Sequence, residues 1–174
     1  QWMKTMAVER FVGNWDSFGY ANEQNMYFYR PEHGPWKLMM WDIDIAFANV
    51  IAAPANTDFF THINRFFNFT AGPTTQRFFK HPPFRREYLR TLQEIAIGPA
   101  LKLNAYVDAK YAAFGSAGVA VASPALLKTY AANRRTLVLN TIARFDLPFA
   151  FTSPSQKRST AETPEITVTG NAPL

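Results

Sequence analysis

Apolar residues recur at helical spacing near the start of the chain. They predict a helix over Trp2–Val12 with one buried side. The residues on that side are Met3, Ala7 and Phe11, and those expected to face away from it are Lys4, Glu9 and Arg10. Gly13 ends the pattern, so Asp16 is expected on a loop just beyond a buried helix.

The second half of the chain shows the same periodicity over longer stretches. Helices are predicted over residues 59–67, 74–79, 82–97, 100–114 and 124–145. Pro82 stands where proline is tolerated at the start of a helix, and Ser123 is the predicted N-cap of the last one. In the helix over residues 82–97 the predicted buried positions are Phe84, Tyr88, Leu92 and Ile95. In the helix over residues 100–114 they are Leu101, Leu103, Tyr106, Val107 and Tyr111.

Two short runs rich in Tyr, Phe, Trp and Met interrupt the helical pattern. Met26–Arg30 and Trp36–Trp41 are predicted to be strands, and the Pro- and Gly-containing segment between them would fold one onto the other. The fold class is therefore predicted as α+β and mainly helical. A hairpin of this size returns the chain to near its start, so Asp16 would meet Asp42 and Asp44 at one end of it.

Clustered carboxylates repel each other, and a bound cation usually neutralises their charge. Oxygen ligands without Cys or closely spaced His suit Mg²⁺ or Mn²⁺ rather than zinc. The amides of Asn22 and Asn25 fall between the aspartates and would add neutral oxygen ligands. Asp42 and Asp44 alternate with apolar residues, so on an extended backbone both carboxylates would face one side. The apolar neighbours expected to pack in the core are Trp41, Ile43 and Phe47.

The composition narrows the class of protein and of partner. The 174 residues are 48% hydrophobic, with sixteen Phe and four Trp, which is enough for one domain with a core. The absence of Cys excludes disulfides, thiolate catalysis and cysteine–metal sites. A net charge of +5 favours nucleotide phosphates or acidic protein segments, and Arg77–Arg90 is the best candidate surface, with a solvated helix face as the alternative. No nucleic-acid-binding motif or membrane-spanning run is visible in the sequence.

Several motifs occur in the order of a known family. NWD at Asn14–Asp16 is followed by N-x-Y-x-Y at Asn25–Tyr29 and by WDIDIAF at Trp41–Phe47. A P-x-F-R-x-x-Y-x-x-x-L pattern then spans Pro82–Leu92, and an Arg-Arg pair, interpreted as structural, stands at Arg134–Arg135. In this order of motifs the chain resembles the spore coat protein H (CotH-like) family of secreted atypical protein kinases.

The resemblance implies the C-terminal lobe of an atypical protein-kinase-like fold, with a small β-hairpin carrying the metal site. It implies transfer of the γ-phosphoryl group of ATP to Ser or Thr of a protein, with Mg²⁺ or Mn²⁺ as cofactor. Asp16 would be the catalytic residue. Asn25 and Asn22 would bind the cofactor, and the metal would be bound by Asp42, Asp44 and Asn25. The protein would be secreted, at the cell surface or on the spore coat, and its substrate would be a coat or surface protein.

Nothing in the sequence resembles the nucleotide-binding N-terminal lobe of a kinase, with its lysine and covering loop. The chain is therefore expected to begin partway through the domain, with that lobe of the same protein as a partner. Residues 1–148 are predicted to be the partial kinase domain, and residues 149–174 a linker and the start of a β-module. In this last segment residues 165–170 alternate like a strand.

Two other functions fit the same residues. A glycosyltransferase of the Asp-x-Asp type would use Asp42 and Asp44 to hold manganese against the diphosphate of a nucleotide sugar. The absence of a nucleotide-binding α/β pattern before Asp42 argues against that reaction. The non-enzymatic alternative is a coat or cell-surface interaction module.

Overall fold

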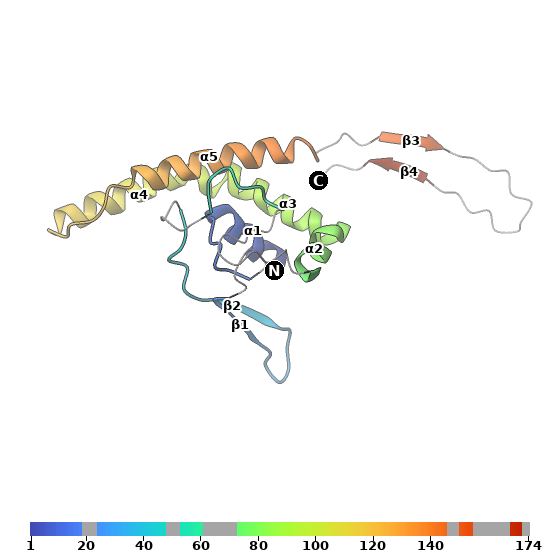
Figure 1. Cartoon of the computed structure of the whole chain (residues 1–174), viewed down its shortest axis with the longest axis horizontal. Coiled ribbons are helices and arrows are strands. Elements are labelled where there is room, and N and C mark those ends of the chain that lie inside the picture. The colour runs from blue at the N-terminus through green and yellow to red at the C-terminus, as the bar shows by residue number, and fades with distance from the viewer. Residues whose placement is uncertain (19–23, 48–52, 61–72, 146–149, 155–167, 172–174) are drawn as a thin grey trace, which may run out of the picture.

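The computed structural model describes residues 1–18, 24–47, 53–60, 73–145, 150–154 and 168–171. In these ranges the chain is mainly helical, with two small antiparallel sheets of two strands each (Figure 1). The elements are α1 (Trp2–Val12), β1 (Met26–Tyr29), β2 (Lys37–Met40), α2 (Pro73–Lys80), α3 (Pro82–Ile97), α4 (Pro99–Ser116), α5 (Ala125–Ile142), β3 (Ala150–Pro154) and β4 (Val168–Asn171). This content is compatible with the predicted α+β class.

The observed helices begin and end within a few residues of their predicted bounds. The largest difference is at the end of α5, which stops at Ile142 and is followed by a turn. Ser123 Oγ accepts a hydrogen bond from the Ala125 amide at 3.4 Å, but the N-cap position belongs to Pro124, one residue later than predicted. No helix in the described ranges is long and apolar enough to cross a membrane.

Helix α1 packs against α3 and α5 and ends at Gly13. Its buried side carries Met3, Ala7 and Phe11, as predicted. Gly13 has φ of 76°, in the left-handed region that favours glycine. A Cβ at this position would lie 1.9 Å from the Tyr130 hydroxyl oxygen. Both the backbone conformation and the available space therefore require glycine here.

The prediction that Glu9 and Arg10 face away from the core is wrong. Both side chains are buried, and the Arg10 guanidinium carbon lies 5.8 Å from the centroid of the Phe79 ring. Only Lys4 of the three predicted polar positions is exposed. Helix α1 is covered on more than one side by other segments, so its polar residues have to find partners inside the protein.

Helix α3 lies along α1 and also contacts α2, α4 and α5. Tyr88 and Leu92 are buried as predicted, whereas Ile95 is half-buried and Phe84 is exposed. The other buried residues of α3 are Leu89, Thr91 and Ala96. The buried surface of α3 is broader than one stripe because three helices besides α1 pack on it. This surface begins at Tyr88, one turn later than the predicted start at Phe84. The core is thus built from α1, α2, α3, α5 and Phe59.

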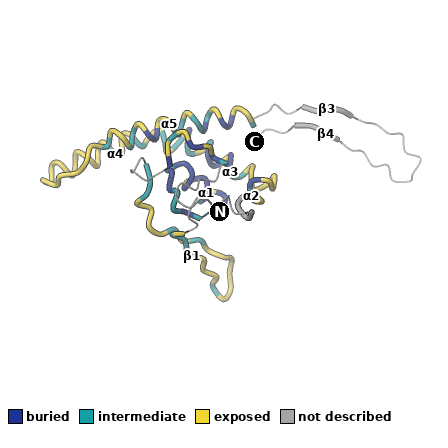
Figure 2. The backbone as a smooth tube through the Cα atoms, viewed as in Figure 1, coloured by how far each residue is buried: buried dark blue, intermediate teal, exposed yellow. Residues whose placement is uncertain are grey.

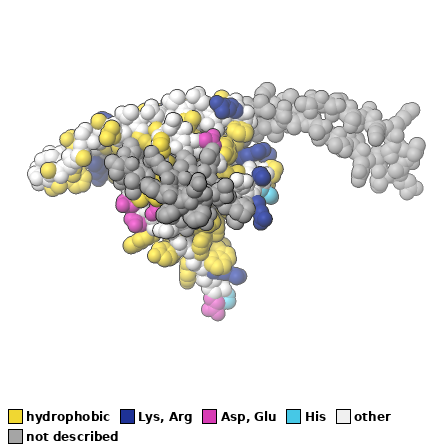
Figure 3. Space-filling model, in the orientation of Figure 1, with side chains coloured by type: hydrophobic (Ala, Val, Ile, Leu, Met, Phe, Trp, Pro, Cys, Tyr) yellow, Lys and Arg dark blue, Asp and Glu magenta, His cyan; other side chains and the backbone are white. Residues whose placement is uncertain are grey.

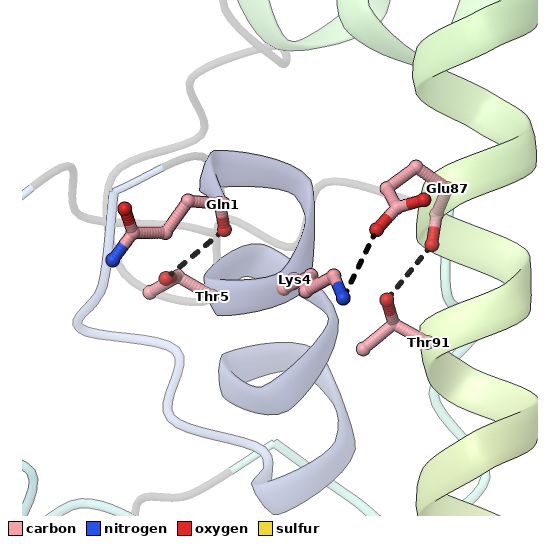
Figure 4. Close-up of polar contacts among 5 residues, drawn as sticks. All are labelled: Gln1, Lys4, Thr5, Glu87 and Thr91. Atoms are coloured by element: carbon pink, nitrogen blue, oxygen red, sulfur yellow. Dashed lines mark hydrogen bonds and ion pairs between the residues drawn. The ribbon is translucent and has the colours of Figure 1, made fainter. Parts of the chain in front are cut away.

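A polar contact also joins α1 to α3 on the surface (Figure 4). Lys4 Nζ lies 3.4 Å from Glu87 Oε1, and the main-chain oxygen of Glu87 accepts a hydrogen bond from Thr91 Oγ1 at 2.8 Å. A partly exposed ion pair of this kind contributes at most about 1 kcal/mol. Buried apolar contacts therefore supply most of the attraction between the two helices.

Helix α4 departs most from its predicted burial, because none of its residues is buried. Leu101, Tyr106 and Tyr111 are exposed, and only Leu103 and Val107 of the predicted stripe are half-buried. Figures 1 and 2 show the reason: much of α4 and the start of α5 project from the body as a helical hairpin, and α3 is the described element of the body that contacts α4.

Arg134 is structural, as predicted for the Arg-Arg pair. Its buried guanidinium group donates to the main-chain oxygens of Arg10 and Phe11, in the last turn of α1, where carbonyls lack helical partners. It also donates to the main-chain oxygens of Ala55 and Thr57. Its guanidinium carbon lies 3.9 Å from the centroid of the Phe59 ring. Helix α5 thereby fastens the end of α1 to the segment at residues 55–59.

The predicted hairpin is present as β1 and β2, with Tyr27 opposite Met39 and Phe28 opposite Leu38. Strand β4 overlaps the predicted strand at residues 165–170 and pairs with β3, which was not predicted. Of the helix predicted at residues 59–67, residues 61–67 lie outside the described part of the chain, and Phe59 and Phe60 lie in a bend rather than in a helix. The domain boundary after residue 148 stays a prediction.

Candidate functional site

The loop that follows α1 places Asp16 between two fully buried residues. Asn14 Nδ2 donates to Glu9 Oε2 at 2.7 Å, and Ser17 Oγ donates to the Asn14 main-chain oxygen at 2.8 Å. Asp16 itself is half-buried. The loop is therefore tied back to the helix that precedes it, which fixes the position of Asp16 relative to the core.

Glu9 is the buried end of this connection. Burial raises the pKa of the Glu9 carboxyl, and the hydrogen bond from Asn14 opposes the rise without cancelling it. The hydrogen bond compensates in part for removing the carboxyl from water. Glu9 was predicted to be exposed, so its part in supporting the loop was missed.

Asn25 joins the two sides of the site. Its Nδ2 donates to Asp16 Oδ2 at 2.7 Å and lies 3.4 Å from the main-chain oxygen of Asp42. Asn25 precedes β1 and Asp42 follows β2, and the Trp41 amide donates to the Asn25 main-chain oxygen at 2.9 Å. The base of the hairpin therefore brings Asp16, Asn25 and Asp42 together. Asn22 lies outside the described residues.

The backbone at the base of the hairpin is bent by two left-handed residues. Asn25 has φ of 58° and Asp42 has φ of 49°, a conformation that Asn and Asp tolerate better than most side chains. The prediction of an extended backbone through Asp42 is wrong at this point, because β2 ends at Met40. The alternation argument for Asp42 and Asp44 therefore does not apply, although both residues are exposed.

The prediction that Trp41 and Ile43 pack in the core is also wrong. They are 64% and 60% exposed, since the left-handed turn at Asp42 directs this segment away from the body. Phe47 is half-buried: its amide donates to the Val12 main-chain oxygen at 2.8 Å, and its ring meets the edge of Tyr130. The segment is thus exposed near Asp42 and Asp44 and fastened to the end of α1 at Phe47.

Comparison with known proteins identifies the family to which the chain belongs. The model of the family described as CotH kinase protein matches residues 1–131. The chain belongs to the CotH kinase protein family. The match runs from α1 into α5 and includes the loop, the hairpin and the segment after it. No curated protein and no solved structure matches the chain.

The residues of this CotH-family site fit a divalent cation in the type of ligand that they offer. Within the described ranges no three His, Cys, Asp or Glu side chains group as a metal site. Mg²⁺ in phosphoryl-transfer enzymes is commonly bound by one or two carboxylates together with substrate phosphates, rather than by a cage of protein ligands. Asp42 and the Asn25 amide oxygen, with Asp44 nearby in the sequence, match that requirement in ligand type.

The supporting roles of Glu9, Gly13 and Asn14 were not predicted from the sequence of this family member. Gly13 precedes the NWD motif and Asn14 is its first residue, and their requirement depends on contacts with Tyr130 and Glu9, respectively. The requirement for Gly13 could have been inferred from its position just after the predicted helix, where glycine commonly adopts the left-handed conformation. No local pattern identifies Asn14 as the partner of a buried glutamate.

Proposed function

We propose that this CotH-family chain carries the catalytic half of a metal-dependent protein kinase, which transfers the γ-phosphoryl group of ATP to Ser or Thr of a protein. The observation that supports it is the Asn25 amide, which links the Asp16 carboxylate to the Asp42 main chain at 2.7 and 3.4 Å. Kinases use an aspartate, an asparagine and a second aspartate in this order along the chain. Membership of a kinase family supports the same reaction.

Asp16 is proposed as the catalytic residue. The hydrogen bond from Asn25 fixes the orientation of its carboxylate, and the burial of Asn14 and Ser17 on either side fixes its backbone. A carboxylate fixed in this way would orient the attacking hydroxyl group of the substrate and accept its proton. Such positioning, rather than covalent chemistry, is the main contribution of a protein to phosphoryl transfer.

We propose that Mg²⁺ or Mn²⁺ is bound by Asp42, Asp44 and Asn25, and that Asn22 takes part with Asn25 in binding the cofactor. When bound, the cation neutralises the charge that develops on the transferred phosphate. The exposure of Asp42 and Asp44 leaves them open to a cation that is shared with ATP.

Exposed apolar residues lie beside this site and form a surface that a second lobe of a kinase could cover. Trp41 and Ile43 follow the hairpin, and Tyr27 and Met39 lie opposite each other on its strands. We propose that an N-terminal lobe of the same protein covers this surface and completes the nucleotide site. The resemblance to CotH-like proteins further supports a secreted, surface or spore-coat location with a coat or surface protein as substrate.

A non-catalytic interaction module is the second candidate, because the same exposed hairpin would serve a permanent binding partner. The Asp-x-Asp glycosyltransferase is less well supported. That reaction uses Asp42 and Asp44 but gives no role to the hydrogen bond between Asn25 and Asp16.

Thermal unfolding in the presence of MnCl₂ and ATP, separately and together, tests the proposal. Metal and nucleotide together at about 100-fold above Kd should stabilise the chain by about 2.7 kcal/mol. For a chain of this size that gain raises the unfolding midpoint by about 5–10 °C. Asp42→Asn should remove the rise, and Glu32→Gln, the same change at the tip of the hairpin, should keep it. A rise with metal alone, or an equal rise in Asp42→Asn, would contradict the proposed site.

A further inference from the structure

Cationic side chains gather on α2 and the first half of α3. The two helices carry five Lys or Arg residues against two acidic ones, and all five are exposed: Arg77, Lys80, Arg85, Arg86 and Arg90. Figure 3 shows dark blue side chains grouped on the right side of the helical body, where Figure 1 places α2. One of the two acidic residues, Glu87, is already paired with Lys4 of α1. A single solvated helix face does not explain the whole arrangement, because two of these cations, Lys80 and Arg85, line a cavity.

The cavity has a volume of about 280 Å³ and lies between α2, the start of α3 and the turn that follows α5. Its lining combines two cations and an amide with three aromatic rings: Lys80, Arg85, Gln76, Phe60, Phe79 and Phe145. The Phe60 ring lies 5.4 Å from that of Phe79 and 5.6 Å from that of Phe145, between centroids. The Arg85 guanidinium carbon lies 6.0 Å from the centroid of Phe145. The cavity therefore has an apolar floor with positive charge above it.

These two features select a particular chemistry. A contiguous aromatic surface favours an apolar side chain, while the Lys and Arg groups favour carboxylates or phosphates placed next to it. Cations at the edge of a cavity also increase the rate at which an anionic partner associates. An acidic protein segment that contains a bulky apolar residue satisfies both requirements, whereas a free anion would not use the aromatic floor.

We propose that this cavity, lined by Lys80, Arg85 and the three Phe rings, is a docking site for an acidic segment of another protein. A bulky apolar side chain of that segment enters the cavity, and carboxylates on either side of it contact Lys80 and Arg85. None of the six lining residues belongs to the candidate site at Asp16, Asn25 and Asp42. Docking requires neither ATP nor metal, so it is independent of the proposed phosphoryl transfer.

Fluorescence anisotropy with a labelled twelve-residue peptide rich in Glu and Asp, with one central Phe, tests the proposal. Lys80→Glu combined with Arg85→Glu should weaken binding by about tenfold or more, because two attractive contacts become repulsive. The matched control is Lys102→Glu combined with Lys110→Glu, which makes the same change of net charge on α4 and should alter binding less than about twofold. If the first variant does not fold, judged by circular dichroism, Lys80→Gln combined with Arg85→Gln replaces it and should weaken binding in the same direction.

Two further probes separate docking from simple charge attraction. A peptide with the central Phe replaced by Ser should bind more weakly to the unmodified chain, because the aromatic floor is then unused. Equal binding of the two peptides, equal loss in both double variants, or absence of binding would overturn the proposal. Two competing anions are added separately: inorganic phosphate, and vesicles of anionic phospholipid. Displacement of the peptide by millimolar phosphate alone would also overturn the proposal.

Discussion

The two segments that meet at the candidate site differ in how the protein supports them. The loop of Asp16 is flanked by fully buried Asn14 and Ser17 and is tied to α1 through Glu9. The hairpin that leads to Asp42 is largely exposed, and hydrogen bonds at its base connect it to the rest of the site. One half of the site is therefore positioned by the core. The other half is positioned by polar contacts at Asn25 and by the ring of Phe28, which stacks on Trp2 of α1 with 4.9 Å between the ring centroids.

This difference has a consequence for mutations. Changes in the support of the Asp16 loop should lower global stability, because that loop shares its contacts with the core. Changes at the base of the hairpin should alter the site while most of the protein stays folded, because few buried apolar contacts depend on the hairpin.

Replacement of Arg134 should have the largest effect on stability. Arg134→Met removes the donor to four main-chain oxygens and leaves acceptors in the last turn of α1 without their partner. The expected loss is at least about 3 kcal/mol, which is a large part of the stability of a single domain. Urea denaturation measures it, with Arg144→Met, at an exposed position in the turn after α5, as the control. A loss below 1 kcal/mol, as for an exposed residue, would show that α5 does not fasten α1 in this way.

Gly13 and Gly115 form a matched pair that compares the core with the projecting helical hairpin. Gly13→Ala puts a methyl group 1.9 Å from the Tyr130 hydroxyl and forces a left-handed φ, so a loss of about 3 kcal/mol is expected. Gly115→Ala, on α4, meets no atom within 4 Å and should gain up to about 1 kcal/mol of helix propensity. The midpoints of urea unfolding measure both changes, and similar losses for the two variants would contradict the contrast between these regions.

The buried carboxyl of Glu9 predicts a smaller, pH-dependent effect. Because burial raises the pKa of Glu9, its protonated form is favoured in the folded chain. The contribution of Glu9 to stability is therefore fully present below the pKa of the unfolded chain and is lost as pH rises through the folded pKa. Relative to Glu9→Gln, the unmodified chain should lose stability across that range.

Urea denaturation of both proteins between pH 4 and pH 8 measures this difference, since the other titrating groups cancel in the comparison. Glu94→Gln, at an exposed position of α3, controls for the change of net charge. A difference that is independent of pH, or one that favours the unmodified chain as pH rises, would contradict the assignment.

The helices and the hairpin were predictable from the sequence because each depends on local periodicity. Met3, Ala7 and Phe11 repeat at helical spacing, and Met26–Arg30 carries residues typical of strands. The burial of individual side chains was predicted less well, because it depends on which helices and strands pack against each other. Tyr111 continues an apolar pattern but lies on the part of α4 that projects from the body, whereas Glu9 breaks the pattern of a helix that is covered on several sides.

The candidate site was predictable in part for the same reason. The order of Asp16, Asn25 and Asp42 along the chain, and the hairpin between them, suggested that the three residues meet, because a hairpin returns the chain to its start. The left-handed conformations of Asn25 and Asp42 and the exposure of Trp41 were not predictable. They follow from how the base of the hairpin joins the loop after α1, which is a tertiary contact.

The most direct test of the candidate site uses Mn²⁺ with ATP as a paramagnetic probe in nuclear magnetic resonance spectra of the backbone amides. Broadening should be strongest for Asp16, Asn25 and Asp42 and their neighbours and weak along α4, and it should be lost in Asp42→Asn. Asn25→Gly, which keeps the left-handed backbone accessible but removes the amide, should weaken the effect while the core resonances of α1 and α3 stay in place. Broadening centred elsewhere, or unchanged in Asp42→Asn, would contradict the account of this site.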